Sequence, residues 1–132
     1  MLLHIANKNY SSWSLRPWLV MTVFDIPFEE RLTRFNDDAG NPEFRKFSPS
    51  GKVPVLVDGD LTVWDSLAII EYLAETFPER AIWPADRAMR AHARAISAEM
   101  HSGFGALRSA CPMNLRRPAG AIGDDLLSSN LS

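Results

Sequence analysis

Short apolar runs separated by polar turns fill the first half of the chain. Residues 2–6 form one such run, and residues 28–35 alternate imperfectly between apolar and polar side chains. Runs at 53–58 and 61–64 flank an Asp-Gly pair, which is a strong signal for a β-hairpin. These patterns predict four strands, of which the last two are joined as a hairpin.

Apolar residues at helical spacing mark further stretches between and after these strands. The first helix is expected to carry Pro17 in its first turn, where the missing N–H of proline is not needed, and to end near Phe24. The clearest helix lies within 65–80, because its apolar residues share one face and either Asp65 or Ser66 can cap its start.

A second long helix is expected to begin near Asp86 and to follow a short linker. Its predicted apolar stripe consists of Met89, Ala93, Ile96, Met100 and Leu107. The periodic pattern fades after Pro112, so the remaining residues are expected to be poorly ordered or to belong to a longer structure.

The order of the elements predicts the fold class. Strand, helix, strand, a short helical turn around 43–47, hairpin and helix make a small α/β sheet with helices packed on it. Residues 1–80 are expected to form this unit. Residues 81–132 are expected to form a linker and part of a helical domain.

Composition and charge narrow the function. The 132 residues are 46% hydrophobic, as in an ordinary globular protein, and the net charge of -2 with interleaved signs argues against a nucleic-acid surface. A single cysteine, Cys111, allows no internal disulfide and favours a reducing compartment. No run is long enough for a membrane span and no signal peptide is evident, so a cytoplasmic protein is expected. His92 and His101 lack metal-ligand spacing, and no metal is expected.

Three motifs together resemble the N-terminal half of a cytosolic glutathione transferase. They are YSSWSLRPW at 10–18, SPSGKVPVLVDGD at 48–60 and WDSLAIIEYLAE at 64–75. The serine pair makes the chain most similar to zeta-like and other serine-type bacterial members. The resemblance covers about 2–80 and extends more weakly to about 110. It implies a thioredoxin-like βαβαββα domain followed by the beginning of the family's all-α C-terminal domain.

The resemblance also implies a glutathione site. The peptide bond before Pro54 is expected to be cis and to present the backbone of Val53 to the tripeptide, although local sequence alone favours a trans bond. Ser66 is expected to bind the γ-glutamyl carboxylate at a helix start, and Asp65 is expected near the γ-glutamyl amine. Lys52 is expected either to reach the glycyl carboxylate or a nearby carbonyl, or to remain solvated.

The reactive sulfur must be held as a thiolate, which is the nucleophile. Lowering its pKa by about two units requires about 2.7 kcal/mol. One hydrogen bond to the charged sulfur supplies roughly 1.5–3 kcal/mol and the helix start about 0.3–1 kcal/mol, so a serine hydroxyl suffices without a separate base. Ser11 and Ser12 are nearly equal candidates: zeta-like members align Ser11 with the catalytic serine, whereas delta- and theta-like members align Ser12. Either serine can also simply cap the helix.

Other residues near these motifs carry weaker expectations. Tyr10 is a third hydroxyl candidate but is expected to be a packing residue, and an ion pair on the helix face is expected for Arg16. Trp13 replaces a cysteine of the zeta-like motif and is expected to border the second-substrate pocket. Packing roles are expected for the following residues: His4, Trp18, Trp64 and Trp83.

The resemblance therefore implies an enzyme with glutathione as cosubstrate. The expected reaction is attack of the thiolate on a small hydrophobic electrophile, with a homodimer as the expected assembly. Two alternatives remain open at this point. One is a glutathione-dependent cis-trans isomerase of the maleylacetoacetate type, which the serine motif supports and Trp13 opposes. The other is a non-catalytic glutathione-binding interaction module.

Overall fold

The fold is built on a four-stranded mixed sheet. The computed structural model describes residues 1–36 and 41–118. The strands are β1 (Leu2–Ile5), β2 (Glu29–Leu32), β3 (Val55–Asp58) and β4 (Leu61–Trp64). They lie in the order β2-β1-β3-β4, with β1 parallel to β2 and β3 antiparallel to both of its neighbours. The predicted hairpin and the thioredoxin-like α/β class are both confirmed.

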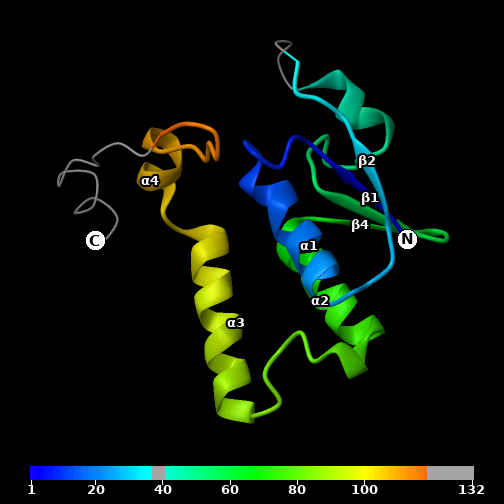
Figure 1. The fold of residues 1–132 in the computed structure, drawn as a ribbon, viewed down its shortest axis with the longest axis vertical. Helices are drawn as coiled ribbons and strands as arrows, with labels where there is room; N and C mark the ends of the chain where they lie inside the picture. The colour runs from blue at the N-terminus through cyan, green and yellow to red at the C-terminus, as the bar shows by residue number, and fades with distance from the viewer. Residues whose placement is uncertain (37–40, 119–132) are drawn as a thin grey trace.

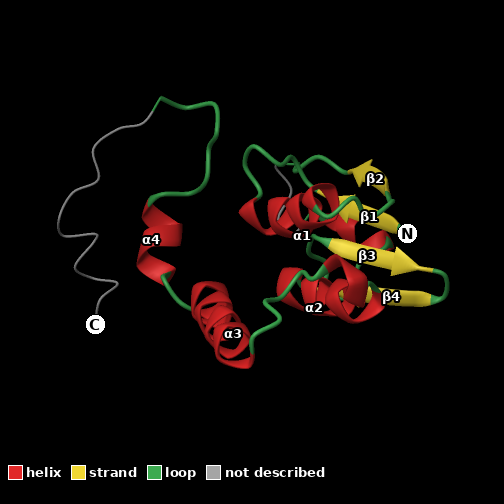
Figure 2. Cartoon of the chain, turned by 60° about the horizontal axis from the view of Figure 1, so that its bottom comes forward, coloured by secondary structure: helices red, strands yellow, loops and turns green. Residues whose placement is uncertain are grey.

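Two helices cover one face of this sheet. They are α1 (Ser12–Val23) and α2 (Ser66–Thr76), which contact each other and the strands beneath them (Figures 1 and 2). Alternate residues of a strand face opposite sides of the sheet, so Leu3 and Ile5 of β1 point toward the helices. The enclosed core cluster consists of Leu3, Ile5, Met21, Ile26, Leu56, Ile69 and Leu73.

The other face of the sheet is covered by the segment around the short helix η1 (Pro42–Lys46). Here His4 is only 6% exposed and stacks on Phe47, with ring centroids 4.1 Å apart. The buried Phe44 packs against the same Phe47 ring. The expectation that His4 is a packed residue is confirmed.

His4 gives stability a specific pH dependence. Burial, with a further contribution from Arg31, its partner in the β1–β2 register, lowers the pKa of His4 below its ordinary value of 6.5, and Glu29 offsets this in part. The unfolded chain then binds the proton more readily, so the free energy of unfolding falls as pH drops below about 6.5 and is unaffected above it. In His4→Phe, which keeps an aromatic ring against Phe47, this component should be absent.

Urea unfolding of the wild type and the His4→Phe variant between about pH 7.5 and 5 measures this component. Carboxylates that do not interact with His4 contribute equally to both proteins, so the difference between the two unfolding free energies isolates the imidazole and its interaction with Glu29. A difference that stays constant across this range would contradict the assignment.

The first helix begins earlier than its proline suggested. Ser11 caps α1, and its side-chain oxygen accepts the Ser14 N–H at 3.3 Å. Pro17 is therefore inside the helix, not in its first turn, and that expectation was wrong. It leaves the Trp13 carbonyl without the usual helical donor, and its ring is fully buried in the packing beneath the helix.

The second helix begins and ends as its sequence indicates. Asp65 is the cap, since its Oδ1 accepts the N–H groups of Leu67 and Ala68 at 2.9 and 3.3 Å. Pro78 follows the helix and opens the short helix η2 (Pro78–Arg80).

The expected long helix is divided in two. Asp86 caps α3 (Arg87–Ser102), and α4 (Gly105–Ala110) follows after a break at Gly103. A Cβ at Gly103 would lie 2.9 Å from the Glu99 carbonyl oxygen, so a residue with a side chain would require the backbone to shift there. Leu107 was expected to continue the apolar stripe of α3, but it lies on α4, so that expectation was wrong.

The stripe residues of α3 remain accessible in the described structure. Met89 is 64% exposed, Ile96 50% and Met100 43%. Arg94 joins α3 to α2 by a two-pronged ion pair with Glu71, with nitrogen–oxygen distances of 3.0 and 3.1 Å.

Of the expected poorly ordered tail, residues 119–132 lie outside the described residues. No helix in the described part of the chain has the length and apolar character needed to cross a membrane.

Candidate functional site

The loop before β3 is closed by Ser48. Its hydroxyl donates to the Lys52 carbonyl at 2.6 Å and accepts the Lys52 N–H at 3.1 Å. Gly51 adopts a φ of +67°, a conformation that side chains disfavour, and Arg45 lies beside it. The peptide bond between Val53 and Pro54 is cis, as the resemblance implied.

The start of α1 carries a short chain of serine hydroxyls. Ser11 is 6% exposed, and its hydroxyl donates to the Ser14 hydroxyl at 2.9 Å. Ser14 is fully buried and accepts the Ala6 N–H, just beyond β1, at 3.1 Å. These contacts hold Ser11 against the central strand. Ser12 is the first helical residue and is half-buried.

The start of α2 is the second fixed point. Ser66 is 2% exposed, and its hydroxyl oxygen has no hydrogen-bond partner among the described residues. The preceding Asp65 has a φ of +79°, a strained conformation for a residue with a side chain. Such strain is retained where surrounding contacts hold the residue, and it is commonly found at functional positions.

These elements surround two adjoining hollows. The Asp65 hollow, about 360 Å³, is lined by Trp13, Ser50, Lys52, Val53, Pro54, Trp64, Asp65, Ser66 and His101. The Ser11 hollow, about 340 Å³, is lined by Ser11, Trp13, Phe35, Asn41, Phe44, Arg45, Ser50, Gly51, Lys52 and Val53. Four residues line both, so the two hollows are continuous along the Val53 loop.

The structure therefore brings most of the sequence-predicted residues together. Ser11 lines the Ser11 hollow, whereas Ser12 is not among its lining residues. Tyr10 is 44% exposed and Trp64 is 47% exposed, so neither is the packing residue that was expected. Trp64 instead forms part of the wall of the Asp65 hollow.

Two arginines surround Trp13 in an arrangement that sequence reasoning missed. The Arg16 guanidinium lies 4.5 Å and the Arg108 guanidinium 4.6 Å from the centroid of the indole. Among the described residues Arg16 makes no ion pair, contrary to expectation. Burial and the nearby Arg108 charge lower the pKa of Arg16, and Asp65 partly opposes this shift.

His101 was also missed as a site residue. It lies one residue before the end of α3, and its Nε2 is 3.1 Å from Asp65 Oδ2. Its ring meets Trp13 edge-on, with centroids 5.2 Å apart. No sequence signal linked it to Asp65, because the contact joins residues that are far apart in the chain.

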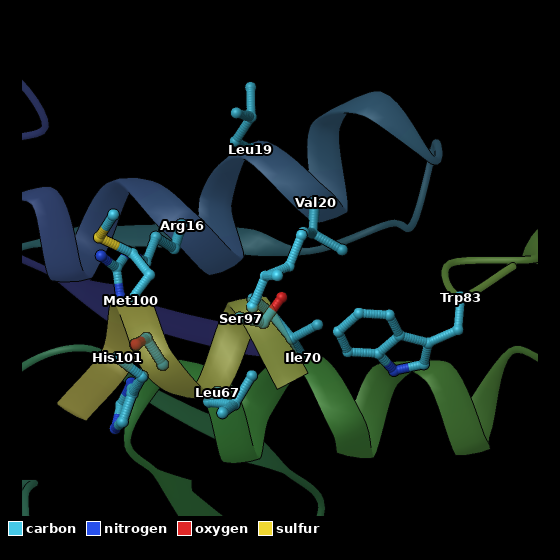
Figure 3. Close-up of a pocket in the computed structure, with 11 residues that line it drawn as sticks. Arg16, Leu19, Val20, Leu67, Ile70, Trp83, Ser97, Met100 and His101 are labelled. Carbon is cyan, nitrogen blue, oxygen red and sulfur yellow. The ribbon is translucent and has the colours of Figure 1, made fainter. Parts of the chain in front are cut away.

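A larger and mostly apolar groove adjoins the site between α1, α2 and α3. It has a volume of about 520 Å³, and Ser66 and His101 belong to both this groove and the Asp65 hollow. Figure 3 shows His101 and Met100 at one end and Trp83 at the other. Trp83 is half-buried and lines this groove. In the described residues no three histidine, cysteine or acidic side chains gather in a way that could hold a metal ion.

Comparisons with known proteins agree with this geometry. A family model described as the N-terminal domain of glutathione S-transferase matches residues 10–76. A zeta-class glutathione S-transferase of Euphorbia esula is 50% identical over 77 residues, which are 58% of this chain and 34% of that protein. A probable maleylacetoacetate isomerase of Caenorhabditis elegans is 34% identical over 97 residues, which are 74% of this chain and 44% of that protein.

The solved structures include a Burkholderia glutathione transferase homolog with bound glutathione. Its TM-score is 0.70 and its identity 29%, and the match covers 80% of this chain and 56% of that one. The chain thus spans less than half the length of the two curated relatives and little more than half of this structure. The matched domain, its fold and its order of motifs place the chain in the glutathione S-transferase family.

Proposed function

We propose that this protein binds glutathione, stabilises its sulfur as a thiolate and transfers it to a small hydrophobic electrophile. The observation that supports this most is the convergence of three separate motifs on the two joined hollows. The residues concerned are Ser11, Lys52, Val53, Pro54, Asp65 and Ser66. Family membership supports the choice of ligand.

In this proposal the tripeptide lies extended along the Val53 backbone, as peptides do when they add to an exposed strand edge. The γ-glutamyl carboxylate meets the start of α2, where the positive end of the helix and the Ser66 hydroxyl attract an anion. The γ-glutamyl ammonium lies by Asp65, and the glycyl carboxylate lies toward Lys52. Ser66 supports this pose because its buried hydroxyl lacks a partner in the described chain.

The thiol then falls in the Ser11 hollow at the start of α1. The Ser11 hydroxyl, which donates to Ser14 in the ligand-free chain, would donate to the sulfur instead. Ser14 would still accept the Ala6 N–H, so its oxygen is not left without a donor. The first turn of α1 has no acidic residue, and the positive end of the helix therefore acts on the thiolate without opposition.

Trp13 supports an apolar second substrate. It lines both hollows and presents an aromatic wall beside Ser11, which suits a flat or apolar electrophile. The exposed Met89, Ile96 and Met100 on α3 support self-association, and we propose a homodimer as the working assembly.

Calorimetric titration with glutathione tests the ligand. The wild type should bind, and Ser66→Ala should weaken the affinity roughly tenfold or more, because a hydrogen bond to a carboxylate contributes about 1.5–3 kcal/mol. Ser102→Ala is the matched control, since within residues 1–36 and 41–118 its hydroxyl bonds only to the Ala98 carbonyl on α3, and it lines neither hollow. Its affinity should equal that of the wild type.

Absence of binding by the folded wild type would contradict the proposal. If binding is present, a chloronitrobenzene conjugation assay beside a maleylacetone isomerisation assay separates transferase from isomerase. Binding without turnover in either assay would instead support a binding module.

A further inference from the structure

His101 is the one residue of α3 that lines the Asp65 hollow. Its Nε2 contacts Asp65 Oδ2 at 3.1 Å, and Trp13 supports its ring from the side. The His101 side chain is 25% exposed, so this contact is partly shielded from water. A helix outside the sheet unit thus contacts the acid at the start of α2.

The two oxygens of Asp65 have separate partners. Oδ1 caps α2 through Leu67 and Ala68, and Oδ2 faces His101. Because both ends are held, the carboxylate cannot rotate freely about its bond to the chain. The strained backbone of Asp65 points to the same conclusion, that this side chain is held in one orientation.

The two ring nitrogens of His101 have different surroundings. Its Nδ1 is buried and has no hydrogen-bond partner among the described residues. With the proton on Nε2, the ring donates to Asp65 and leaves a lone pair at the buried Nδ1. A carboxylate oxygen has more than one lone pair, so Oδ2 can accept a second hydrogen bond beside the one from His101.

Asp65 is also the only carboxylic acid among the described residues that line its hollow. The other charged groups near it are cationic: Lys52 in the same lining, Arg16 on α1 and Arg108 on α4. No other carboxylate lines this hollow in the described residues, so the orientation of Asp65 decides how tightly a ligand ammonium is bound there.

We propose that His101 is a specificity-determining residue that aims Asp65 at the α-ammonium of glutathione, so that the site selects peptides with a free γ-glutamyl amino group. This inference rests on the proposed function. It adds that recognition of this amino group depends on α3, although the three motifs all precede that helix.

The test compares glutathione with its desamino analogue, glutaryl-cysteinylglycine, by calorimetry on the full chain. The wild type should prefer glutathione by about tenfold, the effect of one charge-assisted contact. His101→Leu should reduce this preference to about twofold by weakening glutathione alone. His101→Gln, which retains an N–H donor near the Nε2 position, should restore most of the preference.

Arg94→Leu is the matched control. It removes an ion pair between α3 and α2, the contact of Arg94 with Glu71 at 3.0 Å, but Arg94 does not line the Asp65 hollow. The Arg94→Leu variant should prefer glutathione as strongly as the wild type does. If His101→Leu folds poorly, Arg94→Leu and His101→Gln still report on ligand selection.

The outcomes separate this inference from the proposed function. Equal weakening of both ligands in His101→Leu would show a merely structural role, and tighter glutathione binding would show competition for Oδ2; either result overturns the inference alone. An Arg94→Leu variant that loses the preference would do the same. A wild type with no affinity for glutathione would overturn both proposals.

Discussion

Replacing Ser11 by alanine is expected to lower kcat/KM for glutathione conjugation by roughly 10- to 100-fold, because a hydrogen bond to a charged atom contributes about 1.5–3 kcal/mol. Ser11 is nearly buried, lies in the hollow shared with Val53 and is held by Ser14. The apparent pKa of the bound thiol, followed by the ultraviolet absorbance of the thiolate, should rise in the variant. The loss should therefore be largest at low pH.

Ser12→Ala is the matched control for this prediction. Ser12 is the adjacent residue but is not among the lining residues of the Ser11 hollow, so its loss should change kcat/KM by no more than about threefold. Ser11 also caps α1, and its removal should lower the unfolding free energy by about 1 kcal/mol, which is too little to unfold a typical domain. A larger catalytic loss in Ser12→Ala than in Ser11→Ala would transfer the role to Ser12.

Leu73→Ala should destabilise the fold by about 3 kcal/mol, a typical cost of a large-to-small change in a core. Leu73 is fully buried on α2 and belongs to the cluster that joins both helices to the sheet. The atoms removed from the Leu73 side chain leave a cavity, and the surrounding residues relax only partly to fill it. Urea unfolding, with the midpoint and slope fitted together, measures the change.

Leu19→Ala makes the same chemical change on the neighbouring helix, at a residue that is 49% exposed. It should cost less than about 1 kcal/mol, as is usual for sites outside the core. Similar losses for Leu73→Ala and Leu19→Ala would contradict the placement of the core between α1, α2 and the sheet.

Local signals were sufficient to predict the elements that position the site. The helical spacing of Ile69 and Leu73, together with an acid at the cap, predicted α2, and the Asp-Gly turn predicted the hairpin. The three motifs indicated which residues meet at the hollows. All of these features depend on contacts between near neighbours in the chain or on a resemblance across a whole motif.

The features that sequence reasoning missed depend on tertiary context. Pro17 was placed in a first turn because proline favours that position, and this preference was given more weight than the possible serine cap; the helix in fact begins at Ser12. The break at Gly103 was missed because a single glycine is tolerated inside many helices. Trp64 was read as a packing residue, but β4 is an edge strand and leaves that side chain exposed.

The contacts of His101 and Arg108 were missed for another reason. His101 meets Asp65, and Arg108 stacks on Trp13, only because α3 and α4 return to the starts of α2 and α1. The spacing of apolar residues in α3 and α4 does not indicate that these helices pack near the starts of α2 and α1. A side chain that completes a site from a distant helix becomes visible only once the helices are positioned.

The buried Ser14 hydroxyl has an implication for protein engineering. This hydroxyl accepts the N–H of Ala6, just beyond the end of β1, and also accepts a hydrogen bond from the Ser11 hydroxyl at the start of α1. Transplanting the nine-residue segment at 10–18 onto another scaffold would therefore leave the Ser11 hydroxyl, the proposed donor to the thiolate, without its anchor. The host would need a strand that ends beneath this helix start with a free backbone N–H for Ser14.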